Sequence, residues 1–95
     1  MTANDLGEFS GQMKELEGSL KARILDEKMQ TKKEIKVRDL LKEIEKHKGA
    51  NAIVLDGIIT KRLLEEAEKN KVKQLVGVKK GRIEESKEVK VETLY

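Results

Sequence analysis

The chain has 95 residues, enough for one small domain with a modest core and not for two. It has no cysteine and a single histidine, which excludes disulfides and thiolate metal sites and argues against a histidine-based one. Charged residues of both signs make up 41% of the chain, and the net charge of +3 does not indicate a strongly basic nucleic-acid module. We find neither an apolar run of membrane-spanning length nor a signal-peptide pattern, so we expect a cytoplasmic protein.

The beginning of the chain predicts a short helix. One apolar stripe at helical spacing runs through it, formed by Phe9, Met13 and Leu16. Gly18 is suited to end the helix, because glycine readily adopts the left-handed conformation that follows many helices. We expect residues 1–12 to be an N-terminal extension, partly helical or disordered, and residues 13–95 to form a single α/β domain.

A hairpin and a second helix are predicted next. Residues 20–24 and 34–37 alternate apolar and charged positions, as strands with one buried face do, and the polar stretch between them permits a hairpin. Residues 38–47 carry an apolar stripe at helical spacing, and Gly49 is suited to cap that helix. His47 falls in the last turn, where a cation is favoured, so we assign it a structural role.

The middle of the chain predicts two buried strands joined by a helix. Residues 52–55 and 75–78 are apolar runs, which are typical of strands covered on both faces. Between them, Thr60 is suited to cap a helix that ends near residue 69. This β-α-β order predicts two parallel neighbouring strands.

The end of the chain predicts a second hairpin. A polar connection over residues 79–88 leads to residues 89–93, which alternate as an edge strand does. An edge strand can pair with its copy in a second molecule, so a homodimer is a further expectation. The order α-β-β-α-β-α-β-β predicts an α/β fold, with helices packed on a mixed five-stranded sheet.

Asp56 and Gly57 directly follow a predicted central strand, at the edge where open α/β sheets bind ligands. A lone carboxylate is a poor magnesium site, because such sites usually draw on more than one. The simpler interpretation is a turn, in which Asp56 accepts backbone N–H bonds and Gly57 supplies an unusual φ. Contact with a partner or ligand is the alternative. Thr60 is more simply a helix cap than an anion site, and no cofactor or metal is expected in this chain.

One stretch, residues 69–82, carries basic residues and no acidic ones. Five of its side chains are candidate nucleic-acid contacts: Lys71, Lys73, Lys79, Lys80 and Arg82. Phosphate contacts need only charge and reach. The alternative is a solvated face, partly neutralised by the acidic run at 84–88, and the two aromatic residues of the chain count against base stacking.

Three segments resemble the archaeal DnaG-type primase family. The most specific is Asp56-Gly57-Ile58-Ile59-Thr60, followed by a helix with Arg62 near its start and a strand that ends near a glycine and a basic pair. The second, Leu16-Glu17-Gly18-Ser19-Leu20-Lys21-Ala22, is similar to the family's Leu-Glu-Gly-Thr-Leu-x-Ala segment. The third is Val37-Arg38-Asp39-Leu40-Leu41. The segments occur in the family's order, and the similarity covers about residues 13–95.

The resemblance implies the C-terminal domain of a larger primase. Family members carry an upstream Toprim domain, whose acidic residues bind Mg²⁺ for primer synthesis in DNA replication. The Glu-Gly strand-end motif and the Asp-x-Asp motif of that domain are absent here, so the resemblance implies a non-catalytic piece. The family is also a component of the archaeal exosome, with terminal regions implicated in contacts with the exosome cap and with adenine-rich RNA. The expected partners are the rest of the primase chain, the cap subunit and RNA or DNA, but no membrane.

These observations leave three hypotheses. The first is a protein-interaction module that uses the strand-end edge formed by Asp56, Gly57, Ile58, Thr60 and Arg62, with the basic residues 79–82 beside it. The second is an auxiliary RNA- or DNA-binding domain that uses the basic residues of 71–82. The third is a divalent-metal phosphoryl-transfer domain with primase-like activity of its own.

Overall fold

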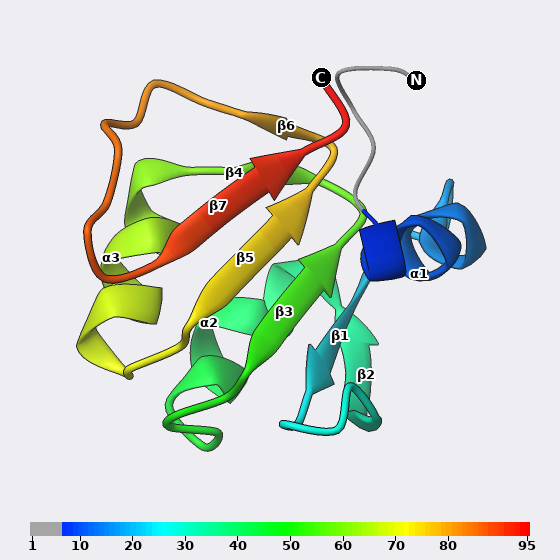
Figure 1. The fold of residues 1–95 in the computed structure, drawn as a ribbon, viewed down its shortest axis with the longest axis horizontal. Helices are drawn as coiled ribbons and strands as arrows, with labels where there is room; N and C mark the ends of the chain where they lie inside the picture. Colours follow the sequence, from blue (N-terminus) through cyan, green and yellow to red (C-terminus); the bar gives the residue numbers. More distant parts are fainter. Residues whose placement is uncertain (1–6) are drawn as a thin grey trace.

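A computed structural model describes residues 7–95 and shows a mixed five-stranded sheet with helices on both faces (Figure 1). The strand order is β2-β1-β3-β5-β7. The strands are β1 Lys21–Leu25, β2 Thr31–Lys36, β3 Ala52–Leu55, β5 Gln74–Gly77 and β7 Lys90–Thr93. β1 runs antiparallel to β2 and β3, whereas β3, β5 and β7 are parallel. The predicted α/β fold, the first hairpin and the parallel pair of central strands are confirmed.

The remaining elements surround this sheet. They are η1 Gly7–Phe9, α1 Ser10–Leu16, η2 Val37–Asp39, α2 Leu40–Ile44, β4 Ile58–Ile59, α3 Lys61–Lys69 and β6 Lys79–Lys80. The short strands β4 and β6 pair in parallel and form a second, two-stranded sheet. In the view of Figure 1, α2 and α3 lie behind the main sheet, and η1 and α1 lie at its right-hand side.

The larger core lies between the sheet and the helices α2 and α3. Alternation along β1 directs Ala22 and Ile24 to this face, where they meet Leu40, Ile44 and the inner side of α3. β3 is buried at every position, as its continuous apolar run predicts, because both of its faces are covered.

The smaller core lies on the opposite face, beneath η1 and α1. The predicted stripe of Phe9, Met13 and Leu16 is buried there against Leu25 of β1 and Val54 of β3. The second part of the predicted N-terminal extension therefore packs on the sheet, while residues 1–6 lie outside the described residues.

The predicted hairpin at the end of the chain is wrong, although β7 is an edge strand as expected. β7 lies parallel to β5, with Leu75 opposite Val91. After β5 the chain enters β6, which pairs with β4 outside the main sheet, and residues 81–89 then return to the start of β5 (Figure 1). Ser86 anchors this return, since its Oγ donates to Glu68 Oε2 of α3 at 2.7 Å. The connection therefore spans the length of the sheet, which makes the next strand parallel.

The helix ends are confirmed only in part. Thr60 caps α3, because its Oγ1 accepts the N–H of Leu63 at 3.1 Å. The helix predicted over 38–47 is shorter: a 3-10 turn precedes α2, which ends at Ile44. Gly49 has the expected positive φ of 77°, but it lies beyond the helix and belongs to the loop that leads into β3.

Candidate partner-binding surface

The Asp56 carboxylate holds a distant part of the backbone in place. Its Oδ2 accepts the N–H of Leu20 at 2.9 Å, and the Asp56 N–H donates to Lys21 O at 3.0 Å. The predicted role of Asp56 as an acceptor of backbone N–H bonds is thus observed, but across two strands rather than within a turn. Gly57 does not have the unusual φ that we predicted, because its φ is not in the left-handed region.

Leu20 is an unusual residue at this end of the sheet. Its φ is +57°, a left-handed conformation that typically costs a non-glycine residue about 1–2 kcal/mol. Both of its backbone polar groups are bound, the N–H by Asp56 and the C=O by the N–H of Val37 at 2.9 Å. Its apolar side chain is nevertheless 68% exposed. The fold therefore presents this side chain to solvent in a strained conformation.

A shallow groove opens beside Leu20. Its volume is about 510 Å³, and it is lined by Ser19, Leu20, Lys21, Lys36, Val37 and Arg38. We call it the Leu20–Val37 groove. Its floor is apolar, and three of its lining residues are basic and none is acidic. Gly57 lies next to it, because a Cβ added there would stand 3.6 Å from Val37 Cγ1.

The predicted partner-binding residues have different roles. The side-chain oxygens of Asp56 and Thr60 are engaged in the hydrogen bonds described above. Ile58 is 45% exposed, and Arg62 is exposed on the first turn of α3. Pairing of β4 with β6 sets Ile58 beside Lys79. The part of the predicted edge that is free to contact a partner is therefore Ile58 and Arg62, with Lys79 beside Ile58.

Gly77 is a structural residue of this region that the sequence patterns did not reveal. A Cβ added at Gly77 would lie 2.9 Å from Ile59 Cγ1 and 3.0 Å from the carbonyl oxygen of Gly57. Such contacts are too close for any side chain, so only glycine lets β4 approach β5 this closely. A glycine at the end of a buried strand was the available signal.

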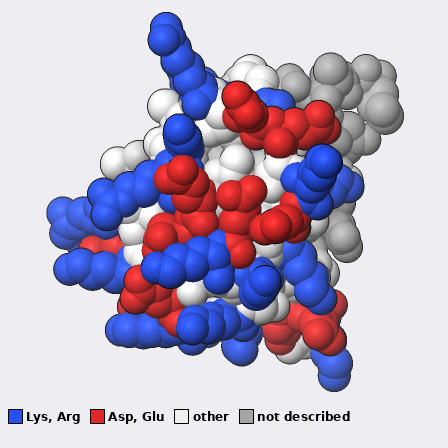
Figure 2. Space-filling view, turned by 90° about the vertical axis from the view of Figure 1, so that its left-hand side faces the viewer, with Lys and Arg blue, Asp and Glu red and all other residues white. Residues whose placement is uncertain are grey.

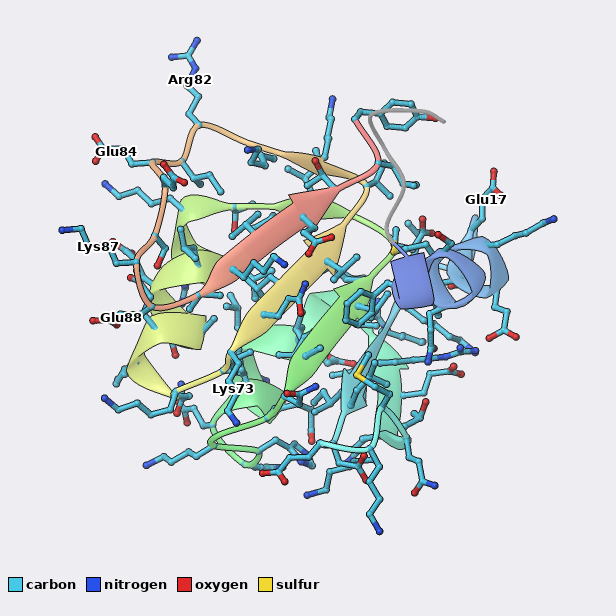
Figure 3. All side chains as sticks on the ribbon, viewed as in Figure 1. Glu17, Lys73, Arg82, Glu84, Lys87 and Glu88 are labelled. Carbon is cyan, nitrogen blue, oxygen red and sulfur yellow. The ribbon has the colours of Figure 1, made fainter. Side chains whose placement is uncertain are left out.

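The predicted basic stretch is divided by the sheet. Lys71 and Lys73 precede β5, whereas Lys79, Lys80 and Arg82 follow it. At about 3.3 Å per residue, a strand from position 73 to position 79 separates the two groups by roughly 20 Å. Figure 3 shows Lys73 near the start of β5 and Arg82 pointing away from the 81–89 segment at the other end.

Acidic residues also lie among these lysines. A groove of about 670 Å³ along β7 is lined by Lys73, Lys80, Lys87 and Lys90, and also by Glu84, Glu85 and Glu88. On the face that carries α3 and the 81–89 segment, Figure 2 shows red carboxylates among the blue basic side chains. The five candidate nucleic-acid contacts therefore do not form one basic stripe.

The strongest ion-pair network lies on the face of α1 and supports the fold. Arg23 of β1 bonds Glu34 Oε1 at 2.8 Å, Gln12 Oε1 at 2.6 Å and Glu15 Oε1 at 2.5 Å. The hydrogen bond that Arg23 donates to Glu15, and next the one that it donates to Glu34, raise the pKa of the Arg23 guanidinium. The same contact lowers the pKa of the Glu34 carboxyl. This network joins α1 to the β1–β2 hairpin.

A second cluster ties α2 to β2. Glu43 Oε1 lies 3.2 Å from Lys33 Nζ and 3.7 Å from His47 Nε2, and Glu43 Oε2 lies 3.5 Å from Lys46 Nζ. Hydrogen bonding from Lys33 and the charge of the two lysines lower the pKa of the Glu43 carboxyl. His47 thus contributes to a structural cluster, as assigned, although it lies past the end of α2.

Residues 7–95 contain no group of three or more acidic, histidine or cysteine side chains placed to hold a metal ion. No helix in this part of the chain has the length and apolarity needed to cross a membrane.

Comparison with known proteins gives consistent relatives. The chain is 40% identical over 84 residues to the DNA primase DnaG of Methanopyrus kandleri, which covers 86% of this chain and 20% of that protein. It is 42% identical over 76 residues to the DnaG of Methanosarcina barkeri, covering 79% of this chain and 15% of that one. It is 38% identical over 91 residues to the DnaG of Metallosphaera sedula, and this alignment covers 93% of this chain and 22% of that protein. The chain belongs to the archaeal DnaG-type primase family.

This DnaG-type chain spans about a fifth of the length of the curated relatives that it matches. No family model and no solved structure matches it. The three segments that carry the family resemblance converge in the fold. The 16–22 segment contributes Leu20 to the Leu20–Val37 groove, and the 37–41 segment contributes Val37 and Arg38. Gly57 of the 56–60 segment lies beside the groove.

Proposed function

We propose that this chain is a non-catalytic protein-interaction module of an archaeal DnaG-type primase. The observation that carries the proposal is the exposure of apolar side chains at one end of the sheet. Leu20, whose N–H is bound by Asp56, is 68% exposed, and Ile58, which follows Asp56 and Gly57 in the chain, is 45% exposed. Exposed apolar residues gathered at one place with a polar rim are typical of protein contact sites.

The electrostatics support a binding role over catalysis. Among residues 7–95, the two polar side chains that the sequence singled out at this end of the sheet have structural hydrogen bonds: Asp56 accepts a backbone N–H and Thr60 caps a helix. Primer synthesis, if the full protein performs it, then belongs to another part of the primase. We assign to this chain the contact with the rest of the primase chain or with the exosome cap, which the family resemblance suggests.

A direct titration tests this function. The chain is immobilised and titrated with a purified archaeal exosome that contains its cap subunit, and in parallel with the remainder of the primase. We expect at least one of them to bind. The Ile58→Asp, Arg62→Glu variant should bind that partner at least tenfold more weakly, because it places a charge in the apolar contact and inverts its rim.

The matched control is Lys32→Glu, an exposed lysine of β2 at the other end of the sheet, which should bind as the unchanged chain does. Absence of binding to both partners, or equal binding by the Ile58→Asp, Arg62→Glu variant, would contradict the proposal. Mg²⁺-dependent nucleotide incorporation by this chain alone would replace it with the catalytic hypothesis. Tight binding of adenine-rich RNA that weakens in Lys79→Ala, Lys80→Ala would replace it with the nucleic-acid hypothesis.

A further inference from the structure

We propose that the Leu20–Val37 groove binds an extended acidic segment of a partner protein, which inserts one large apolar side chain between Leu20 and Val37. This inference rests on the proposed function, since it names the class of ligand taken by the same end of the sheet. The ligand class follows from three independent features of the groove: its apolar floor, its largely unpaired basic rim and its position in the fold.

The core accounts for Val37, which packs against it, but not for the exposed side chain of Leu20. Leu20 belongs to neither core cluster, and its side chain is 68% exposed. Hydrogen bonds to Asp56 and Val37 hold it in the left-handed conformation. Strained residues that their surroundings hold in place are concentrated at binding sites. Covering Leu20 with an apolar side chain of a partner would recover about 25 cal/mol for each Å² of apolar surface removed from water.

The rim of the groove selects the charge of the ligand. Lys21, Lys36 and Arg38 line it, and no acidic residue does. Among residues 7–95, neither Lys36 nor Arg38 has an ion pair within 4 Å, and Lys21 has only a loose one, 3.8 Å from Glu34 Oε2. Carboxylates of a ligand would therefore meet three basic side chains that are free or weakly paired, which favours an acidic segment.

The groove lies where the three family segments meet. Each segment contributes a buried residue that the core accounts for: Leu16, Leu40 and Ile59. Each also contributes an exposed residue that the core does not account for: Leu20, Arg38 and Ile58. These three exposed residues lie at the same end of the sheet. A ligand in the groove would contact Leu20 and Arg38, which line it, whereas Ile58 lies outside the lining.

A protein segment fits the groove better than a nucleic acid does. Single-stranded nucleic acids bind through aromatic stacking and rows of basic residues. No aromatic residue lines the groove, and its floor is aliphatic. An apolar pocket with a basic rim instead matches a short linear motif in which one bulky side chain is flanked by Asp and Glu.

The test uses a defined probe, a fluorescein-labelled peptide of sequence Glu-Asp-Glu-Leu-Phe-Glu-Asp-Glu. Binding to the chain is followed by fluorescence anisotropy, and its site by amide shifts in ¹⁵N–¹H spectra. We expect saturable binding, with the largest shifts at Leu20, Lys21, Val37, Arg38 and Gly57. Two control peptides, one with Ser-Ser for Leu-Phe and one with Gln and Asn for the acids, should each bind at least tenfold more weakly.

The decisive variants keep the backbone intact. Leu20→Asn removes the apolar side chain but retains a residue that tolerates the left-handed conformation, and it should bind the peptide at least tenfold more weakly. Arg38→Glu should also weaken peptide binding at least tenfold, because it places a negative charge beside the acidic peptide. Lys32→Glu makes the same charge change outside the groove and should leave the affinity within twofold, and thermal unfolding checks that all three remain folded.

Three results would overturn the inference: no saturable binding at millimolar peptide, unchanged binding by Leu20→Asn, or amide shifts that map to residues 79–82 and not to the groove. Competition at the groove by a single-stranded oligoadenylate with higher affinity would also overturn it, because the ligand would then be a nucleic acid. None of these results requires the partner titration with the Ile58→Asp, Arg62→Glu variant to fail. The experiments therefore distinguish a wrong ligand for the groove from a wrong function for the chain.

Discussion

Both ends of the central sheet contain non-glycine residues with a left-handed backbone, but the side chains of these residues differ in exposure and polarity. Leu20 at one end and Met29 and Lys71 at the other are the three non-glycine residues with positive φ among residues 7–95. Lys71 follows α3 and points a charge to solvent, and Met29 is half-buried and accepts the amide N–H of Asn51 at its sulfur at 3.2 Å. Leu20 alone combines the strained backbone with an exposed apolar side chain. The strain at Leu20 is therefore not merely a requirement of chain reversal.

The two ends also differ in their polar contacts. At the Lys71 end, the loops bind one another: Gly49 N donates to Asn70 O at 2.8 Å, and the buried Asn70 side chain donates to Glu66 O at 2.8 Å. At the Leu20 end, the Asp56 carboxylate holds the backbone together with two backbone hydrogen bonds, from Asp56 N–H to Lys21 O and from Val37 N–H to Leu20 O. Both ends are therefore held by hydrogen bonds, and the exposed apolar side chain of Leu20 distinguishes the second.

The largest expected effect on the free energy of unfolding is at Gly77, which lets β4 pack closely against the end of β5. Gly77→Ala should lower the free energy of unfolding by about 2 kcal/mol, because the new Cβ collides with Ile59 and with the Gly57 carbonyl. Urea unfolding followed by circular dichroism measures this. The matched control is Gly11→Ala, which has open space around it in α1 and should stabilise the protein by about 0.5 kcal/mol. Equal effects of the two changes would show that β4 is not packed as described.

Removal of the Asp56 carboxylate should have the next largest effect. Asp56→Ala should cost about 1 kcal/mol of unfolding free energy, since it leaves the strained Leu20 without its hydrogen bond. Asp56→Asn retains an oxygen acceptor and should cost less. In a Leu20→Gly background the cost of Asp56→Ala should shrink, because glycine needs no bond to hold a left-handed φ. Additive effects in this double-mutant cycle would contradict the coupling between the two residues.

The matched pair Leu20→Gly and Lys71→Gly compares the two ends directly. Each change should raise the free energy of unfolding by about 0.5 kcal/mol, because the relief of left-handed strain slightly exceeds the added entropy of glycine in the unfolded chain. Only Leu20→Gly should also weaken binding of the acidic peptide. A loss of binding in both variants would mean that the ligand does not depend on the Leu20 side chain.

The smallest expected effect concerns acid stability away from both ends. Arg23 holds the pKa of Glu34 below its ordinary value of 4.5, so ionised Glu34 stabilises the folded state above that pH. This stabilisation should be lost as pH falls through the lowered pKa of Glu34 in the folded protein. Denaturant unfolding between pH 6 and pH 3 should show a smaller decline in Glu34→Gln than in the unchanged chain. An identical decline in both would show that the contact is not maintained in solution.

Much of this fold follows from local patterns. The apolar runs of β3 and β5, the alternation of β1 and the helical stripe of Phe9 are short-range signals of burial, and the structure confirms them except at Leu20. The alternation placed Leu20 on the buried face of the strand, whereas it lies before β1 and is 68% exposed. The capping role of Thr60 is equally local, because a helix start depends on a few adjacent residues. The family resemblance also depends on contiguous segments, and the relatives confirm it.

The tertiary structure alone decided the rest, because it depends on contacts between residues far apart in the chain. Alternation at 89–93 was compatible with either a hairpin or a parallel strand, and the path of the 81–89 segment along the sheet selected the latter. The basic stretch was continuous in the sequence, yet β5 divides it into two groups. Asp56 was predicted to bind nearby backbone and instead binds Leu20, 36 positions away. The groove beside Leu20 forms where residues 19–21 meet residues 36–38, which the β1–β2 pairing and the Val37–Leu20 hydrogen bond bring together.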